Sequence, residues 1–429
     1  RATADPADAV QAATDWLATN TRGSTGWYLT APSARTNTVE AAYDSDGSFV
    51  YRALDPVRGA PAPRETLGGE FFYRLHFELE LPYPWGRLLA SIAAMAMLVA
   101  LITGIIAHRR IFKDYFTFRP AKGQRSWLDG HNALGVLATP FHLMITFTGL
   151  VTLASLNMPW AISATYGKDL AAVYHDLAPG VAERARANVP VPLAQRRLGG
   201  TIGRVYVINP GDRAAVVTIF RSDADQIGFT PAEISFDGAT GRPLRAWREN
   251  RGAIQTYNVV YGLHMARFAS IATRWLYFLG GAMLTLAIAT GLVLWIVKRR
   301  ERAPLSLGNR VLERLNAGVL PGVPLGCAAY LLANRLLPLG LTGRAELEVS
   351  TALWAAAAAV AMGAALPPRW SWPLLTGATA LACTLAALIG LSISVMSAVL
   401  LAVAAALALL AAKQLRPPKR APERRRRAA

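Results

Sequence analysis

The stretch HNALGVLATPFHLMITFTGL (residues 131–150) has the composition of a membrane helix and yet carries two histidines. A run of this length without Asp, Glu, Lys or Arg is long enough to cross the hydrocarbon core of a bilayer. In a straight helix, eleven residues place His131 and His142 about 20° apart around the axis and about 16 Å apart along it. Polar side chains inside membrane helices are rare and often functional. The stretch therefore predicts two imidazoles on one face at two depths.

The whole chain has the composition of a multi-pass membrane protein. It has 429 residues, 53% of them hydrophobic, and a mean hydropathy of +0.28. Seven apolar runs reach membrane-spanning length. They cover about 88–107, 132–158, 275–297, 317–340, 349–366, 372–390 and 392–412. We therefore predict a polytopic α-helical membrane protein with seven helices in this chain.

The basic residues follow the pattern of cytoplasmic membrane loops. The net charge is +18, but Lys and Arg concentrate beside apolar runs, so we predict the lipid bilayer as a partner and no nucleic acid. The most basic segments are 109–130, 298–314 and the tail 413–429, and they share one side if the helices alternate. The positive-inside rule makes that side, with the C-terminus, cytoplasmic.

Two polar segments, 1–84 and 159–262, then lie on the periplasmic side of a bacterial inner membrane. Each contains strand-like runs, such as GWYLTAP and GRVYVINP, between Gly and Pro turns, which predicts an α+β domain in each segment. Because an exported N-terminal domain needs an export signal, we expect one further helix upstream, eight in the full protein. The remaining regions are predicted as a helix pair at 85–158, one helix at 263–300 and four C-terminal helices at 301–412.

The first 300 residues contain an internal repeat. LHFELELPYPWGRLLASIAAMAMLVALITGII resembles LHMARFASIATRWLYFLGGAMLTLAIATGLVLW. The matched residues are His76 with His264, Arg87 with Arg274, and Thr103-Gly104 with Thr290-Gly291. A polar segment precedes each copy, so we predict a duplication. Internal repeats in membrane proteins place functional sites at the interface between the copies.

Five stretches resemble the PepSY-associated transmembrane family, also called iron-regulated or iron-uptake membrane proteins. They are FFYRLHFEL (71–79), HRRIFKDYFTFRPAKGQRSWLDGHNAL (108–134), PFHLMITFTGLVTL (140–153), YGLHMARF (261–268) and the FDGATGRPLR turn (236–245). The resemblance covers residues 1–300 and implies PepSY-like periplasmic domains. Some members are similar to inner-membrane ferric-siderophore reductases, which implies one or two b-type haems. Members normally begin with a helix bearing an early histidine, which this sequence lacks.

Five histidines are candidate axial ligands, because haem in a membrane electron carrier is held by imidazoles from facing helices. By depth, His108 lies at the cytoplasmic end of its helix, His131 roughly 5 Å further in, and His142 near mid-membrane. His76 and His264 both lie about 30 Å to the other side of the centre. The depth-consistent pairs are His108 with His131 or His142, and His76 with His264. A His142–His264 pair would need a tilted or broken helix, and each histidine also has a structural alternative.

Other candidate residues are arginines. Arg87, Arg267 and Arg274 can hold haem propionates or another anion through paired hydrogen bonds, and the alternative is snorkelling to the membrane surface. Thr-Gly pairs suit either helix packing or clearance for a macrocycle. His175 is expected at a surface. The sequence has no dinucleotide-binding glycine turn or P-loop, so electrons must come from a separate donor, a membrane quinol or a cytoplasmic reductase.

Three functions fit these features. The first is a haem b reductase that moves electrons outward to a periplasmic ferric-siderophore. The second is a non-redox PepSY scaffold or transporter accessory protein in iron uptake, and the third is a permease. Histidines at stacked depths favour the first. The helices after residue 315 are interpreted as lacking internal charges, which disfavours a proton-driven permease.

Overall fold

The structure is a computed structural model. It describes residues 4–45, 48–107, 124–157, 197–229, 232–389 and 394–416, with isolated positions between 158 and 196. The chain forms two compact units. The first contains residues 1–63, 74–114 and 135–284, and the second contains residues 64–73, 115–134 and 285–429.

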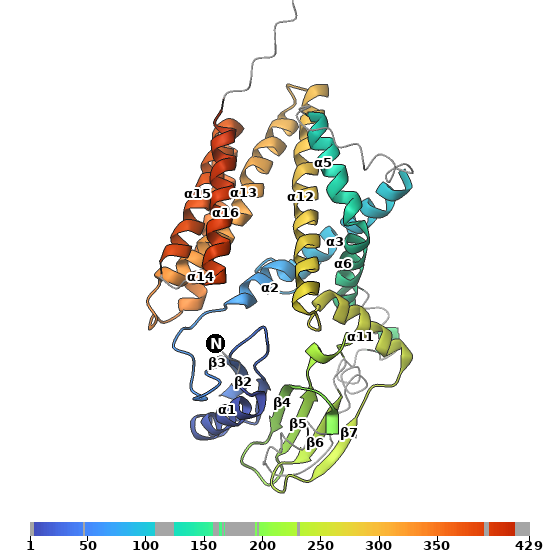
Figure 1. Cartoon of the computed structure of the whole chain (residues 1–429), viewed down its shortest axis with the longest axis vertical. Helices are drawn as coiled ribbons and strands as arrows, with labels where there is room; N and C mark the ends of the chain where they lie inside the picture. Colours follow the sequence, from blue (N-terminus) through green and yellow to red (C-terminus); the bar gives the residue numbers. More distant parts are fainter. Residues whose placement is uncertain are drawn as a thin grey trace, which may run out of the picture. The chain divides into compact units, whose positions relative to one another are not determined.

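The described part of the first unit contains one antiparallel sheet of seven strands, in the order β3-β2-β1-β4-β5-β6-β7 (Figure 1). The strands are β1 (Gly26–Thr30), β2 (Val39–Ser45), β3 (Ser48–Leu54), β4 (Ile202–Ile208), β5 (Val216–Arg221), β6 (Glu233–Asp237) and β7 (Pro243–Trp247). Strand β1 pairs with β4, with Trp27 opposite Val207. A short 3₁₀ helix, η1 (Asp223–Asp225), follows β5.

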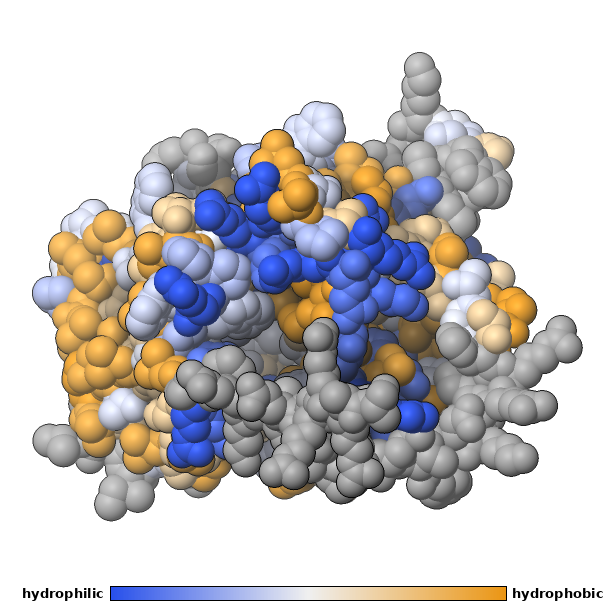
Figure 2. All heavy atoms as spheres, turned by 90° about the horizontal axis from the view of Figure 1, so that it is seen from above, coloured by the Kyte–Doolittle hydropathy of each residue, from blue (hydrophilic) through white to orange (hydrophobic). Residues whose placement is uncertain are grey.

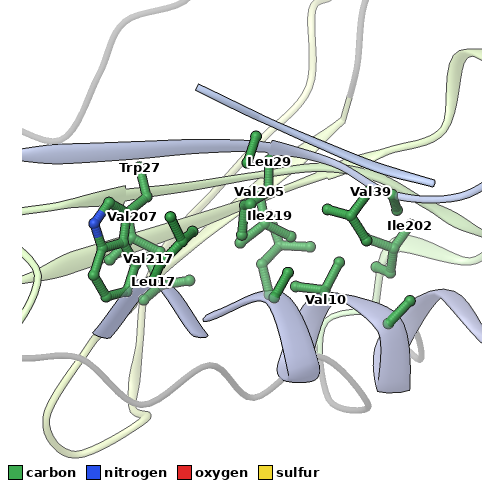
Figure 3. Packing of buried hydrophobic residues seen from close by; sticks show 14 of the residues in the cluster. Val10, Leu17, Trp27, Leu29, Val39, Ile202, Val205, Val207, Val217 and Ile219 are labelled. Atoms are coloured by element: carbon green, nitrogen blue, oxygen red, sulfur yellow. The ribbon is translucent and has the colours of Figure 1, made fainter. Parts of the chain in front are cut away.

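Helix α1 (Pro6–Asn20) packs on one face of this sheet (Figure 3). Asp5 caps it by accepting a hydrogen bond from the Ala7 amide, and Pro6 fits the first turn because it has no N–H to satisfy. Val10 and Leu17 meet Leu29 of β1 and Val205 of β4, all fully buried. Each such side chain stabilises the fold by roughly 1.5–3 kcal/mol.

This core differs from the two separate domains expected in segments 1–84 and 159–262. Strands from both segments lie in one sheet over one hydrophobic core. The physical reason is that a three-stranded β1–β3 sheet would leave the backbone groups of β1 unpaired at an edge, and β4 pairs with them.

Among the residues that the structure describes, six helices are long and apolar enough to cross a membrane, or seven spans if one bent pair counts as a span. They are α3 (Trp85–Ala107), α12 (Ile271–Arg302), α13 (Leu307–Leu336), α14 (Arg344–Ala365), α15 (Pro368–Leu388) and α16 (Val395–Gln414). With the bent pair, each of the seven predicted runs has its counterpart. The basic residues of the predicted loop 298–314 lie mostly on the last turns of α12 and the first turns of α13.

The bent pair is α5 (Gln124–Leu137) and α6 (Thr139–Thr152), and the short α7 (Ala154–Asn157) follows. The two helices meet at 63°. Pro140 sits in the first turn of α6, and proline breaks a helix because it lacks an N–H and clashes with the preceding turn. The single straight helix predicted for this region is therefore wrong, and so is the arithmetic that placed His131 and His142 on one stripe.

Two short helices precede long ones. α2 (Gly69–Glu78) carries His76 in its last turn and α11 (Gly252–Met265) carries His264 in its last turn. Left-handed residues then turn the chain into α3 and α12, namely Leu79 and Glu80 after α2 and Ala266 after α11. The likeness follows the predicted repeat, and the duplication itself stays a prediction.

In the second unit, α13 and α14 pack closely because small residues face each other. A methyl group added to Gly318 would lie 2.8 Å from Val360 Cα. Small residues at such positions let helix backbones approach in a membrane. The end of α12 and the start of α13 form a hydrophilic surface (Figure 2). Its basic residues are Lys298, Arg299, Arg300, Arg302, Arg310 and Arg314.

A buried ion pair in α14 corrects the expectation that the C-terminal helices lack internal charges. Arg344 and Glu348 are both 0% exposed and bonded to each other. Glu348 also accepts hydrogen bonds from Asn334 at 2.8 Å and from Thr66 at 2.5 Å. The hydropathy pattern misses this pair because both residues lie in the first turns of an otherwise apolar helix.

Candidate functional site

The structure brings His76 and His264 together in the first unit. Their ring centroids are 6.1 Å apart and their planes differ by 21°. Imidazole nitrogens bind metals at roughly 2 Å, and each ring nitrogen lies about 1 Å from its ring centre, so two imidazoles on opposite sides of one metal have centroids about 6 Å apart. The observed separation would therefore leave room for one metal ion between the two imidazoles.

Helix α6 holds the His264 ring in a defined orientation. His264 Nδ1 lies 3.1 Å from the Ile145 carbonyl and 3.2 Å from Thr148 Oγ1. The Thr148 hydroxyl donates its own hydrogen to the Met144 carbonyl at 2.7 Å. Both oxygens facing Nδ1 are thus acceptors, which assigns the proton to Nδ1 and leaves the lone pair on Nε2. Metal-binding histidines usually donate their second N–H in this way.

Burial keeps His264 neutral. It lowers the pKa of His264 to about 4, and the neighbouring His76 adds to this lowering. The ring is accordingly uncharged at pH 7, as a metal ligand must be. Gly149 lies against the same ring, and a methyl group there would be 2.8 Å from His264 Cε1. Glycine at this position is what allows the ring to approach α6.

His142 is a second buried imidazole on α6. It is 1% exposed, and within the described residues neither ring nitrogen makes a hydrogen bond of normal geometry. Thr146 lies one helical turn further on, and its buried hydroxyl also lacks a partner there. An unsatisfied buried polar group costs roughly 1–3 kcal/mol. For His142 the cost is reduced by the backbone of Gly280, which lies close enough for a weak hydrogen bond.

His131 lies in the second unit, against α12. Its Nδ1 is 3.1 Å from Thr290 Oγ1, and Thr290 donates to the Leu286 carbonyl at 2.7 Å. A methyl group at Gly291 would lie 3.1 Å from His131 Cε1. His108 lies outside the described residues, so its pairing with His131 or His142 stays a prediction.

The predicted arginines all have protein partners. Arg87 pairs with Glu78 at 3.1 Å, as does Arg74 at 2.9 Å. Arg267 pairs with Asp223 at 2.7 Å, and Arg274 Nε donates to the Ala269 carbonyl at 2.9 Å. These contacts leave less capacity for an anion than the sequence suggested.

The sequence did not single out Arg35 or Ile145. Arg35 donates to the Ala266 carbonyl at the end of α11, and burial together with Arg274 and Arg267 lowers the pKa of Arg35. Ile145 acts on His264 through its backbone carbonyl, and a backbone role leaves no trace in residue type. The packing of α11 on α6 shows the Ile145 contact, and the position of the β1–β2 connection beside the end of α11 shows the Arg35 contact.

The donor chemistry of the site fits haem. Among the described residues there is no group of three or more His, Cys, Asp and Glu side chains that could hold a metal ion. Structural and catalytic zinc sites need three or four protein ligands. Haem needs only one or two axial side chains, since the porphyrin supplies the other ligands. This pair of imidazoles, an exposed His76 and a half-buried His264, therefore suits haem better than a bare cation.

A family model described as the PepSY-associated TM region matches residues 1–298. The chain belongs to the PepSY-associated transmembrane family. It is also similar to the uncharacterized protein PA4219 of Pseudomonas aeruginosa, with 28% identity over 343 residues, which cover 74% of this chain and 85% of the relative. The family predicted from the sequence is thus confirmed. Together with the apolar helices, the match shows that this PepSY-associated protein is a multi-pass membrane protein.

Proposed function

We propose that this PepSY-associated protein is a haem b-containing reductase of the bacterial inner membrane, which moves electrons across it to a periplasmic ferric-siderophore. The observation that carries the proposal is the His76–His264 pair, with centroids 6.1 Å apart and the His264 tautomer set by α6. The buried His142, whose ring makes no hydrogen bond of normal geometry within the described residues, supports one further ligand position. The resemblance to ferric-siderophore reductases supplies the substrate class.

The residues have distinct roles in this proposal. When bound, haem b supplies one-electron transfer. His76 and His264 would hold its iron from α2 and α11, and the Ile145 carbonyl and Thr148 hydroxyl keep His264 Nε2 available. Low exposure around His142 excludes water. No residue acts as a nucleophile or a general acid, because the reaction adds one electron to Fe³⁺ and breaks no covalent bond.

The electron enters from a quinol or a cytoplasmic reductase and leaves to Fe³⁺ in the chelate. Oxygen-rich siderophores hold Fe²⁺ less tightly than Fe³⁺, so reduction promotes release of the iron. The basic surface at the end of α12 and the start of α13 supports a cytoplasmic location for that end by the positive-inside rule. The sheet domain of the first unit would then face the periplasm.

The first test is spectroscopic. The full chain is purified in detergent from cells supplied with haem precursor, and oxidised and dithionite-reduced spectra are recorded with a pyridine haemochrome count. We expect a reduced b-type band that His76→Ala and His264→Ala both diminish, because they share one iron. His142→Ala should remove a separate part of the haem. His175→Ala, for which we predict no ligand role, is the matched control.

The outcomes separate the candidate functions. A haem-free wild-type protein, or a haem content that none of the three histidine substitutions changes, overturns the proposal and returns the protein to the scaffold alternative. With haem present, reduced protein mixed with a ferric-siderophore should reoxidise while a ferrous-iron chelator traps Fe²⁺. If the reduced protein is not reoxidised by the ferric-siderophore, the substrate assignment is wrong.

A further inference from the structure

We infer that the Thr-Gly pairs 148–149 and 290–291 are cradles for histidine rings, and that Thr148 and Thr290 are positioning residues for His264 and His131. The inference rests on the proposed haem function, because it names the residues that hold the candidate haem ligands in place. Each threonine contacts ring nitrogen Nδ1, and each following glycine lies against ring atom Cε1. The same arrangement occurs once in each unit of the chain.

The threonine hydroxyls are fixed as acceptors. Thr148 donates to the carbonyl four residues earlier at 2.7 Å, and Thr290 does the same to Leu286 at 2.7 Å. A hydroxyl has one hydrogen and two lone pairs. With the hydrogen committed to the helix backbone, only a lone pair faces the imidazole. Each threonine therefore requires a proton on Nδ1 and leaves Nε2 as the metal-binding atom.

Glycine is required at positions 149 and 291 because of the histidine rings and not because a neighbouring helix backbone lies close. All three nearest atoms to a methyl group built at Gly149 belong to His264, and all three at Gly291 belong to His131. The packing glycine Gly318 in the second unit differs, because its nearest atoms are the backbone of the neighbouring helix, at Val360 and Ala359. The sequence left helix packing and clearance for a macrocycle open for the Thr-Gly pairs, and the structure shows a third arrangement at two of them, in which the glycine lies against a histidine ring.

A third pair provides a control within the chain. Thr103 also donates to the carbonyl four residues earlier, Val99, at 2.7 Å. A methyl group at Gly104 would meet no described atom within 4 Å. The local helix chemistry is therefore the same, but no ring occupies this pair among the described residues. Substitutions at 103 and 104 report what a Thr-Gly change does to the helix alone.

The expected consequence is a change in the iron environment. Donation from Nδ1 makes an imidazole a stronger electron donor to its metal, and such partners typically change metal affinity or activity by 10–100-fold. Thr290→Val removes the hydroxyl acceptor described for His131 Nδ1. Thr148→Val leaves His264 with the Ile145 carbonyl. We expect Thr290→Val to raise the midpoint potential of its haem and to lower haem affinity at least roughly tenfold, with a smaller change for Thr148→Val.

The test compares haem content, midpoint potential and the low-spin electron paramagnetic resonance spectrum of the full chain. The variants are Thr290→Val, Thr148→Val, Gly291→Ala and Gly149→Ala. Thr103→Val and Gly104→Ala are the controls, and Thr290→Ser should restore the wild-type potential because it keeps the hydroxyl. His131→Ala and His264→Ala assign each signal to its site. Gly149→Ala should displace the ring and lose haem, whereas Gly104→Ala should keep it.

The two proposals fail in different ways. Wild-type protein without haem overturns the proposed function itself. Wild-type protein with haem whose potential and spectrum do not change in Thr290→Val and Thr148→Val overturns the cradle inference and leaves the function standing. Equal shifts in Thr103→Val would also overturn the inference, because the effect would then belong to the helices and not to the histidines.

Discussion

The chain buries polar groups in two contrasting ways. In the second unit, Arg344 and Glu348 are fully buried and nearly saturated with partners, since Arg344 bonds Glu348 and the carbonyls of Glu65 and Asn334. In the first unit, His142 is equally inaccessible, yet neither ring nitrogen makes a hydrogen bond of normal geometry among the described residues, although the backbone of Gly280 lies close enough for a weak one. Protein folding satisfies the first group internally and leaves the second unsatisfied.

The difference separates a structural role from a binding role. A buried charge is tolerated only when it is paired and hydrogen-bonded. The network around Glu348 meets that requirement and ties residues 65 and 66 to α13 and α14. An unpartnered imidazole stabilises nothing in the protein alone, and a bound ligand would give it a partner. The substitutions of Glu348 and His142 below test this distinction, and Gly318→Ala is a comparison in which the loss comes from packing alone. The three are given in order of their expected effect on stability.

The largest effect is expected for Glu348→Gln. The change keeps the shape of the side chain and removes its charge, which leaves the Arg344 guanidinium buried without a counter-ion. Breaking a buried pair in this way costs about 3–5 kcal/mol. Thermal unfolding of the detergent-purified protein, followed by helical circular dichroism, should show the loss. Haem content per folded molecule should stay unchanged. If Glu348→Gln unfolds at the same temperature as the wild type, the network does not stabilise the protein.

A smaller loss is expected for Gly318→Ala in α13. The added methyl group would lie 2.8 Å from Val360 Cα and 3.0 Å from the Ala359 carbonyl, and such overpacking costs roughly 1–3 kcal/mol. Gly377→Ala in α15 is the matched control, because nothing lies within 4 Å of its added methyl group. Unfolding measured as above should separate the two variants. Equal stabilities would show that α13 and α14 do not depend on this close approach.

The sequence predicts some of these features better than others. The six long apolar helices and the bent pair follow from hydropathy alone, because a long apolar run has few alternatives in water or lipid. Strand β2 was not predicted, since VEAAYDS has two alanines and two acids, and its pairing with β1 and β3 decides its conformation. The bend near Pro140 could have been predicted from the proline itself. An average hydropathy over the run does not show it.

In the candidate site, too, the sequence predicts some features, and others depend on tertiary packing. Spacing and residue type identified the histidines and the Thr-Gly pairs, and depth along the helices paired His76 with His264. The hydrogen-bond partners of the rings depend on which helices pack together. Ile145 illustrates this limit, because any residue at that position offers the same carbonyl to His264.

The sharpest test of the contrast is His142→Leu, for which we expect almost no loss of stability. Leucine fills a similar volume and removes two nitrogens that make no hydrogen bond of normal geometry in the described structure, and such a replacement is nearly neutral or stabilising. In protein from haem-depleted cells, the variant should unfold within about 1 kcal/mol of the wild type. In haem-replete protein it should be the less stable of the two, because only the wild type gains stability from ligand binding at this position.

Thr146→Val is the matched control for His142→Leu, because it removes an unpartnered buried hydroxyl one turn away on the same helix. It should leave both haem content and stability near wild type. If His142→Leu instead destabilises the haem-depleted protein as strongly as Glu348→Gln, then His142 has an internal partner and a structural role. The contrast between the two units would then disappear, and the haem assignment would depend on the His76–His264 pair alone.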